Sequence, residues 1–435
     1  MRLLRPRLRR VLAVTMKMKN IKDKLQKIDK DHYLLLIDIG KVAEEQKLKA
    51  YLVGGMVRDL LLGFDNLDID IVVENNAKLL AEALVKKFTN CEISAKHDRF
   101  HTAKVIFTIN NKKIPIDLAS TREEIYEKPA ALPTVKVSDL KSDLIRRDFT
   151  INALAVSLMP SDFGEIVDLF NGLVDLKDKK IRILHDESFI DDPTRMIRAI
   201  RFAAKLGFEI EEHTKNLLKQ AIDSKQFDNL IENIRGDRVK IEIRYLFNLP
   251  NVEEAIKLFF ESGIYKMVST SLTPSRGLPW QTPTNNLYDR SLQWLIYFAL
   301  LMKDLTTQDQ MMKNLQMTTD EIKIIQCAFQ ACEKLQETNI DSIFVYRTLK
   351  DLSLESISIV KLLIPSINNL IDEYLEKTSK IKLEITGQDL ISMGIPSGKK
   401  IGEILDKVLE MKIKNLNMKK EDEMQEVKKL TSSNF

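Results

Sequence analysis

Two aspartates, Asp68 and Asp70, stand two residues apart in the apolar stretch "LDIDIVV". Because alternate residues of a strand share a face, a strand here would hold both carboxylates side by side. Two such acids repel one another and are costly to bury unless a cation lies between them. Carboxylate oxygens suit Mg²⁺, which often binds through one or two carboxylates plus substrate phosphates. We predict a magnesium site at Asp68 and Asp70, joined by Asp117 as a third catalytic acid; a solvent-facing acidic edge is the alternative.

A glycine pair and an arginine precede these acids. Gly54 and Gly55 join an expected strand, "KAYLV", to an expected helix, "MVRDLLLG", and Arg58 follows one turn on. N–H groups at such a junction bind anions, and glycine lets a phosphate approach closely. The G-x-G-x-x-G pattern of dinucleotide sites is absent, and a plain turn is the alternative. A phosphate site beside acids indicates nucleotidyl transfer with two metal ions.

A second polar stretch, "LIRRDFTINALAV", contains an arginine pair. A guanidinium binds phosphate through paired donors. We therefore expect an arginine here to bind a triphosphate and the polar groups to lie near a ribose. A surface charge cluster at a helix start is the alternative. The candidate residues are Arg146, Arg147, Asp148 and Asn152, of which all but Arg146 enter the predicted nucleotide site.

The stretch "FIDDPTRMIRAIRFAAKLGFEI" predicts a helix that begins at Pro193 with Asp192 as its N-cap. Arginines then recur every third residue, at Arg195, Arg198 and Arg201. One interpretation is a capped helix with a solvated basic stripe. The other is a nucleotide site, in which Asp191 could take over the cap.

The hydrogen-bonding edges of the bases explain how such a nucleotide site could select its substrate. Cytosine and adenine both present an amino donor beside a ring-nitrogen acceptor, whereas uracil and guanine present the reverse order. A carboxylate beside a guanidinium therefore accepts C and A and rejects U and G. Good bidentate pairing is worth roughly 1–3 kcal/mol of discrimination. Asp192 and Arg195 are the expected pair.

The elements that must position these residues change character along the chain. The first 160 residues mix strands with helices, including a helix over 24–46 and a hairpin of "TAKVIFTI" with "KKIPIDLA". After about residue 186 helical patterns dominate. The Pro- and Thr-containing segment 269–286 is a candidate boundary. The expected fold class is α+β, with a long helical body after the head.

Length and composition limit the number of domains and the kinds of partner and metal site. A chain of 435 residues predicts two to four domains. The formal net charge of +4 requires any nucleic-acid partner to be met by a local basic surface. The three cysteines have no metal-ligand grouping, and the five histidines are scattered. The longest apolar stretch is too short to span a bilayer, so we expect no membrane partner.

The first ten residues carry five arginines, and no acid precedes Asp23. An arginine-rich, acid-poor start is typical of an organelle-targeting peptide. An extended or misassigned start is the alternative, since Met16 and Met18 could both initiate. We expect cytoplasmic localisation, or mitochondrial localisation if this segment is a targeting peptide.

These motifs together resemble the class II tRNA nucleotidyltransferase and bacterial poly(A) polymerase family. "VGGMVRD…LDIDIVV", "RRDFTINALAV", "VDLFNGLVDLKDKKIRIL" and "DDPTRMIRAIRFAAKLGF" look like four of its motifs, and the resemblance is strong over 50–210. It implies that Asp68 and Asp70 hold Mg²⁺. The family's nucleotide-contacting positions match Gly55, Arg58, Arg147, Asp192, Arg195, Arg198 and Arg201. One departure is Asp191-Asp192, where the family often has Glu-Asp.

The resemblance also implies a layout. A polymerase-β-like nucleotidyltransferase head with a mixed sheet is followed by an all-helical neck, body and tail. The expected bounds are an N-terminal extension over 1–22, the head over 23–165, the neck over 166–275, the body over 276–375 and the tail over 376–435.

The implied activity is template-independent addition of CCA to the 3′ end of tRNA from CTP and ATP. Segment 121–144 resembles the flexible loop of members that add the terminal A. A-only addition and poly(A) synthesis remain alternatives, and a catalytically silent helical RNA-binding protein is the non-enzyme alternative. Intact Asp68, Asp70 and Asp117 argue against the silent protein.

Overall fold

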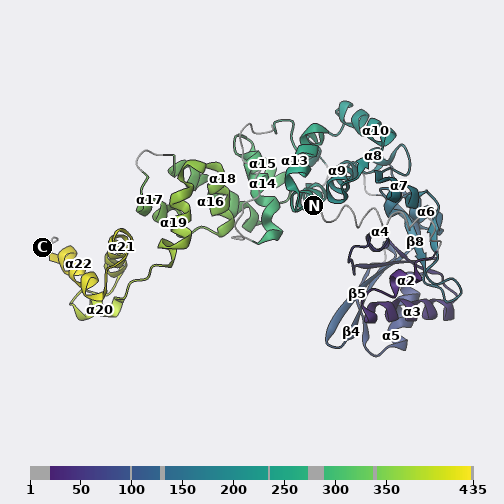
Figure 1. The fold of residues 1–435 in the computed structure, drawn as a ribbon, viewed down its shortest axis with the longest axis horizontal. Coiled ribbons are helices and arrows are strands. Elements are labelled where there is room, and N and C mark those ends of the chain that lie inside the picture. The colour runs from purple at the N-terminus through teal and green to yellow at the C-terminus, as the bar shows by residue number, and fades with distance from the viewer. Residues whose placement is uncertain are drawn as a thin grey trace. The chain divides into compact units, whose positions relative to one another are not determined.

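The structure is a computed structural model, and it describes residues 20–97, 100–127, 133–233, 236–272, 289–336 and 340–432. The chain divides into two compact units, one of 1–242 with 254–270 and one of 243–253 with 271–435 (Figure 1). Most of the predicted extension 1–22 and of the predicted boundary 269–286 lies outside the described residues.

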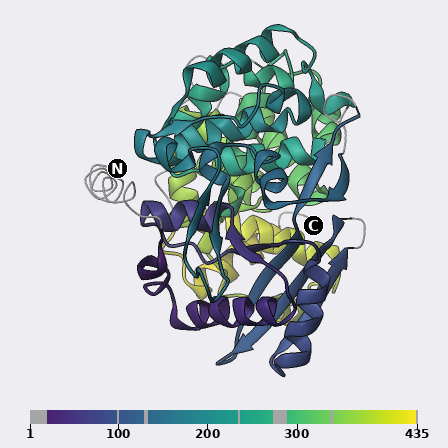
Figure 2. The ribbon, with the colours of Figure 1, turned by 90° about the vertical axis from the view of Figure 1, so that its right-hand side faces the viewer.

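The first unit contains a mixed sheet, as the family resemblance implies, and this sheet has seven strands. Only β2 and β5 run parallel; every other neighbouring pair is antiparallel. Figure 2 shows these strands from a second direction. In spatial order they are β3 (Cys91–His97), β4 (Thr102–Ile109), β5 (Lys112–Ser120), β2 (Ile69–Val73), β1 (Ala50–Val53), β8 (Leu154–Ser157) and β9 (Ile166–Asp168).

The expected hairpin of β4 and β5 is confirmed, but two local expectations need correction. Asp68 precedes β2 and is exposed, because its N–H donates to the side chain of Asn66 in the approach loop. The helix expected over 24–46 is two helices, since the Asp29 side chain caps a new start by accepting from the N–H groups of Asp31 and His32. These helices are α2 (Lys22–Leu25) and α3 (Lys30–Glu45).

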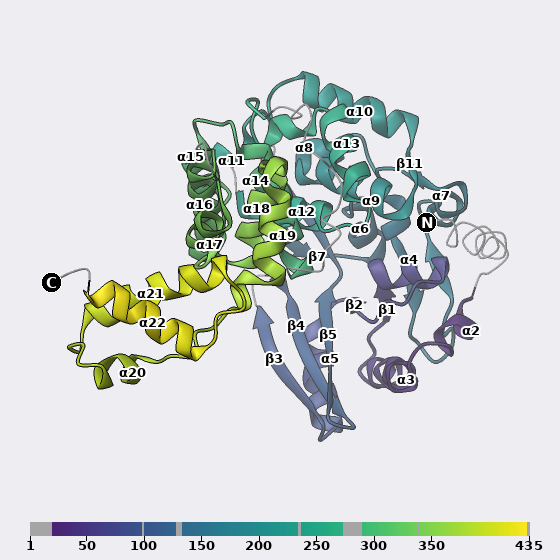
Figure 3. The ribbon, with the colours of Figure 1, turned by 60° about the vertical axis from the view of Figure 1, so that its left-hand side comes forward.

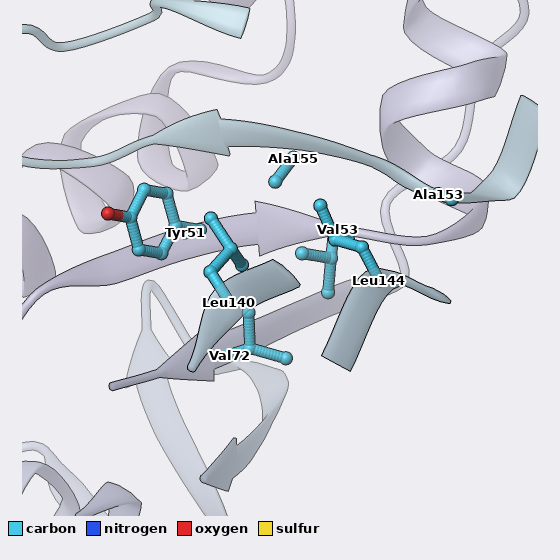
Figure 4. Close-up of a cluster of buried hydrophobic side chains, with 7 residues drawn as sticks. All are labelled: Tyr51, Val53, Val72, Leu140, Leu144, Ala153 and Ala155. Carbon is cyan, nitrogen blue, oxygen red and sulfur yellow. The ribbon is translucent and has the colours of Figure 1, made fainter. Parts of the chain in front are cut away.

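A buried cluster fixes the position of the arginine pair relative to the acids. Leu140 and Leu144 of α6 (Leu140–Ile145) pack on Val53 and Val72 of the sheet (Figure 4). Val72 lies two residues from Asp70 and so shares its face. Because Arg146 directly follows α6, this core holds the arginine pair over the same face as Asp70.

The remaining elements of the first unit are mainly helical, apart from the small pairs β6–β7 and β10–β11. The helices α4 and α9 carry site residues, and the β6–β7 hairpin was not anticipated as strands. The bounds are α4 (Gly55–Leu62), α5 (Ala77–Lys87), β6 (Arg122–Ile125), β7 (Thr134–Val137), η2 (Thr150–Asn152), α7 (Gly172–Asp178), β10 (Lys180–Ile181), α8 (Ser188–Asp191), α9 (Thr194–Leu206), β11 (Glu209–Ile210), α10 (Glu212–Asp223), α11 (Leu230–Asn233) and η3 (Ile264–Met267). Helices α12 (Gly236–Phe247) and α13 (Val252–Glu261) carry the chain between the two units.

The second unit is helical throughout its described residues (Figure 3). Its last part has its own apolar cluster, which includes Ile385, Leu390 and Val408. There the fully buried carboxylate of Glu423 accepts from Lys412 at 2.5 Å and from the N–H groups of Glu384 and Ile385. The bounds are η4 (Arg290–Leu292), α14 (Gln293–Met302), α15 (Gln308–Asn314), α16 (Thr319–Lys334), α17 (Ser342–Leu349), α18 (Leu354–Leu363), η5 (Pro365–Ile367), α19 (Asn368–Glu376), η6 (Thr378–Lys380), α20 (Gly387–Ser392), α21 (Lys399–Lys414) and α22 (Lys420–Ser432).

Across the part of the chain that the structure describes, no single helix is long and apolar enough to cross a membrane.

Candidate active site

The glycine pair lies where the sequence places it, between β1 and α4. Gly54 has φ 76°, a left-handed conformation that other residues adopt at a cost. A Cβ on Gly54 would lie 3.3 Å from Oδ2 of Asp70 and 3.7 Å from Nη1 of Arg147. The N-terminus of α4 therefore comes close to an acid and an arginine that are distant in the sequence.

The acids line up across the sheet. Asp70 of β2 is the register partner of Asp117 of β5, and Asp117 is the register partner of Lys104 of β4. Burial, with the nearby carboxylates of Asp68 and Asp117, raises the pKa of Asp70 to about 6, although Arg147 and Lys104 oppose this. Asp117 Oδ2 accepts a hydrogen bond from Lys104 Nζ at 3.0 Å.

This donor set fits a magnesium ion that takes further ligands from a substrate. Within the described ranges, no three His, Cys, Asp or Glu side chains converge closely enough to hold a metal by themselves. Mg²⁺ usually needs only one or two carboxylates, with phosphates and water completing its shell. Burial first, and then the carboxylates of Asp68 and Asp117, raise the pKa of Asp70, and a bound cation would oppose both effects.

A chain of buried polar contacts connects the head to α9. Arg58, with 3% of its surface exposed, donates to Asp59 at 2.8 Å and to Asn152 Oδ1 at 2.7 Å. Asn152 Nδ2 donates to Asp148 at 2.9 Å, and Arg198 Nε donates to the other oxygen of Asp148 at 2.8 Å. These contacts fix the orientations of the side chains relative to one another.

These polar contacts keep the Asp148 carboxylate ionised. Burial alone would raise its pKa, but the Arg198 guanidinium and the Asn152 amide lower the pKa to about 2. The same pairing, with Glu242, raises the pKa of Arg198 despite its burial. Both groups therefore stay ionised at neutral pH.

The arginine row on α9 is not a solvated stripe, so that interpretation is wrong. Arg195 is buried and donates to Ser188 Oγ at 2.8 Å and to the carbonyl of Arg146 at 2.6 Å. Glu242 of α12 accepts from Arg198 at 2.8 Å and from Arg201 at 3.0 Å. Acids of α12 and the head therefore neutralise Arg198 and Arg201, which are half-buried, while a hydroxyl and a backbone carbonyl hold the buried Arg195.

Asp192 has two kinds of partner. Its Oδ1 accepts from the N–H and the hydroxyl of Thr194, the first residue of α9. The helix therefore begins one residue later than predicted, with Pro193 and not Asp192 at the N-cap position, although Asp192 still binds the first N–H of the helix. Its Oδ2 accepts from Arg238 at 2.6 Å. The expected role of Asp191 as a substitute cap is wrong, because Asp191 ends α8 and lies 3.9 Å from His185.

The two arginines after α6 share one acid, and one of them binds a second acid as well. Both Arg146 and Arg147 bind the fully buried carboxylate of Asp143, at 2.6 and 2.9 Å. Arg146 also donates to Glu124 of the β6–β7 hairpin at 2.9 Å. The hairpin is thus tied to the segment that approaches Asp70.

One cleft of about 660 Å³ in the first unit brings most of the predicted residues together. Asp68 and Asp117 do not line it, although Asp70 does. Ten of the predicted residues that line it are Gly54, Gly55, Arg58, Arg147, Asp148, Asn152, Asp192, Arg195, Arg198 and Arg201.

Several lining residues were not expected from the sequence. Tyr126 on the hairpin donates to Glu124 at 2.8 Å, and α12 supplies Arg238 and Glu242. The acid in the apolar run "VKIEIRYLF" was the available signal for Glu242, because a lone acid among apolar residues of a helix needs a partner. No local pattern pointed to Tyr126.

Three family models match successive parts of the chain. Residues 50–182 match the poly A polymerase head domain, residues 207–273 the RNA- and SrmB-binding site of polymerase A, and residues 286–424 domain 2 of tRNA nucleotidyltransferase. A solved structure of the Thermotoga maritima CCA-adding enzyme complexed with tRNA is 31% identical. The alignment covers 96% of this chain and 99% of that one, with a TM-score of 0.76.

The chain belongs to the tRNA nucleotidyltransferase and poly(A) polymerase family. This nucleotidyltransferase also resembles a CCA-adding enzyme structure in its apo form, at 34% identity and a TM-score of 0.77, over 95% of this chain and 99% of that one. The A-adding tRNA nucleotidyltransferase of Geobacter sulfurreducens is 33% identical over 92% of this chain but only 47% of its own length. This chain spans about half the length of the A-adding relatives that it matches.

Proposed function

We propose that this protein adds CCA to the 3′ end of tRNA, using CTP and ATP. The observation that carries the proposal is the single cleft in which the Gly54 junction, Asp70 and the Asp192–Arg195 pair meet. Relatives named CCA-adding enzyme support it, since this chain covers 90–97% of their length at 27–29% identity. The three A-adding relatives, at 33–38% identity, favour A-only addition as the second candidate.

The reaction joins an RNA end to a nucleotide. The RNA 3′ oxygen bonds to the α-phosphorus, the bond to pyrophosphate breaks, and the hydroxyl proton passes to solvent. Asp68 and Asp70 are proposed to hold Mg²⁺, with Asp117 as the neighbouring third acid. Bound metal would lower the pKa of the attacking hydroxyl and stabilise the leaving pyrophosphate.

The chain's own residues position the nucleotide. The N–H groups at Gly54 and Gly55 are proposed to bind a phosphate, together with Arg147, which lines the same cleft. Arg58, Asp148, Asn152 and the α9 arginines form the ordered polar wall beside the sugar and phosphates. Asp192 and Arg195 read the base by its amino donor and ring nitrogen.

Three tRNA transcripts test the activity: one ending before CCA, one after C and one after CC. Each is incubated with CTP, with ATP and with both. Completion of all three supports CCA addition, while extension of only the CC-ending transcript identifies an A-adding enzyme. A long A run on each transcript would identify a poly(A) polymerase, and no extension would identify a silent RNA-binding protein.

The relatives are bacterial proteins and give the mitochondrial alternative no support, so we place the activity in the cytoplasm.

We expect the hairpin to act as a lever when the incoming base changes from C to A. Glu124 links β6 to Arg146, whose carbonyl in turn accepts from Arg195. Glu124→Gln weakens that link, so A addition should fall about tenfold while CC addition changes less than about twofold. The lever is expected over 121–137, within the segment 121–144 that resembles the flexible loop, and its residues 128–132 lie outside the described residues.

Single-turnover rates for C and A addition on the matching transcripts measure this. Glu123→Gln is the matched control, because Glu123 neighbours Glu124 on β6 and does not line the cleft. Equal losses for C and A in Glu124→Gln would show that the hairpin does not distinguish the two steps.

We expect the lysine-rich tail to bind the tRNA backbone. The segment after Lys380 has its own apolar cluster and exposes Lys399, Lys407 and Lys419. A chain ending at Lys380 should bind tRNA at least tenfold more weakly and show a shallower salt dependence, with CTP affinity unchanged. Titration of labelled tRNA at several salt concentrations measures both quantities, and a folded truncation with wild-type tRNA affinity would refute the tail's role.

A further inference from the structure

The two proposed metal ligands are held by different parts of the fold. Asp70 belongs to β2, whereas Asp68 is exposed in the loop that leads from α4 to β2 and has no place in the strand ladder. A working metal site needs its ligands held within about 0.5 Å of the productive geometry. A contact of the loop itself must therefore fix Asp68 relative to Asp70.

The side-chain amide of Asn66 supplies such a contact. Its Oδ1 accepts from the N–H of Asp68 at 2.9 Å, and its Nδ2 donates to Oδ2 of Asp59 at 2.8 Å. A backbone N–H can only donate and an ionised carboxylate can only accept, so a single orientation of the amide satisfies both contacts. Asn66 therefore joins the backbone of the loop to a side chain of α4.

The Asp59 carboxylate that anchors the loop is itself fixed. Asp59 is 4% exposed, and its other oxygen, Oδ1, accepts from Arg58 Nε at 2.8 Å and pairs with Arg58 Nη2 at 2.7 Å. A Cβ on Gly55 would lie 3.5 Å from Arg58 Nη2 and 3.6 Å from Asn66 Nδ2, so both donors lie beside the first turn of α4. One buried carboxylate thus holds the arginine of the proposed phosphate site and, through Asn66, the loop of the proposed metal site.

We propose that Asn66 is a positioning residue of the metal site, which links Asp68 to Asp59 and so fixes the backbone that carries the Asp68 carboxylate. This inference rests on the proposed function. Groups that orient the ligands of a metal without touching it typically strengthen metal binding by about 10- to 100-fold. A contact that only closed a local turn would need the Asn66 oxygen and the N–H of Asp68, but not Asp59.

Asn66→Ser in the full chain separates these two roles. The hydroxyl can still accept from the N–H of Asp68, but the shorter side chain cannot reach Asp59 as well. With CTP and a tRNA transcript that ends before CCA, the Mg²⁺ concentration for half-maximal rate should rise about tenfold, while kcat at saturating Mg²⁺ stays within about threefold of wild type. A role in the local turn alone, or in folding alone, would leave the Mg²⁺ dependence unchanged.

Thermal unfolding in Mg²⁺ without substrates gives a readout besides activity. The rise in Tm, measured for each protein against its own metal-free Tm, follows mass action. Asn66→Ser should therefore need about tenfold more Mg²⁺ than the wild-type protein for the same rise. Leu67→Ala is the matched control, because Leu67 is 46% exposed in the same loop and should shift neither Mg²⁺ dependence.

The outcomes separate this inference from the proposed function. A wild-type Mg²⁺ dependence of rate and Tm in Asn66→Ser, or a wild-type Tm that does not respond to Mg²⁺, would overturn the role of Asn66. Failure of the wild-type protein to extend any tRNA transcript would instead overturn the proposed function, and the Tm titration would still test Asn66.

Discussion

Replacing Asp70 by Asn is expected to lower kcat/KM for nucleotide addition by at least about a thousand-fold. Each factor of ten in rate corresponds to about 1.4 kcal/mol, and a bound metal ion supplies several kcal/mol of charge stabilisation. Asp68→Asn should have a comparable effect. Rates with Mg²⁺ and saturating CTP, on a transcript that ends before CCA, measure the loss.

Stability gives this prediction a second readout. The pKa of Asp70 is raised to about 6, so its folded state binds the proton more tightly than the unfolded chain. Ionisation of Asp70 therefore lowers the free energy of unfolding as pH rises from its ordinary 3.8 to about 6. Asn has no such charge, and Asp70→Asn should melt at or above the wild-type Tm at neutral pH in metal-free buffer.

The effect of Mg²⁺ on the Tm separates a metal-binding role of Asp70 from a structural one. Mg²⁺ should raise the Tm of the wild-type protein by mass action and leave that of Asp70→Asn unchanged. Asp65→Asn is the control, because Asp65 is exposed in the loop before β2 and does not line the cleft. Near wild-type turnover in Mg²⁺ by either acid variant would refute the metal site.

Replacing Asp192 by Asn is expected to relax nucleotide selection by roughly ten- to a hundred-fold. The amide keeps one oxygen, which can still accept from the N–H of Thr194, but it exchanges the other oxygen for a donor. A donor at that place no longer accepts the amino group of C or A and tolerates the carbonyl of U or G. The loss corresponds to the roughly 1–3 kcal/mol of a bidentate contact.

Incorporation of all four nucleotides, measured separately, tests this selection. The overall rate should fall as well, since a misplaced base carries its α-phosphate away from Asp70. Asp192→Ala also removes the capping acceptor and should destabilise the fold by about 1 kcal/mol. Asp191→Asn is the control, because Asp191 does not line the cleft. An unchanged four-nucleotide ratio in both Asp192 variants would leave Asp192 as a cap alone.

The structure shows that Asp192 already has a partner on the oxygen that would contact the base. Arg238 already donates to Oδ2 of Asp192, the oxygen that does not contact Thr194. A carboxylate oxygen has two lone pairs, so it can accept from both a guanidinium and a base. Arg238 therefore fixes the position of the Asp192 carboxylate and leaves it a free lone pair for the proposed contact with a base.

The sequence by itself determined the local parts of this protein. Strand periodicity and the glycine pair predicted β1, the Gly54 turn and α4. The separation of Asp68 and Asp70 predicted two acids on one strand, of which only Asp70 lies in β2. The spacing of Arg195, Arg198 and Arg201 predicted a helical row. These features depend on interactions within a few residues, which periodicity and turn chemistry report directly.

Only the tertiary structure decided which distant groups meet. Arg198 pairs with Asp148, fifty residues earlier, and with Glu242, forty-four residues later. The row of Asp70, Asp117 and Lys104 depends on a strand order that places β5 beside β2. Such pairings follow from the packing of the whole sheet against its helices, which no local pattern encodes. The same packing places the arginines of the apparent basic stripe in the wall of the cleft, where acids hold Arg198 and Arg201 and a hydroxyl and a carbonyl hold Arg195.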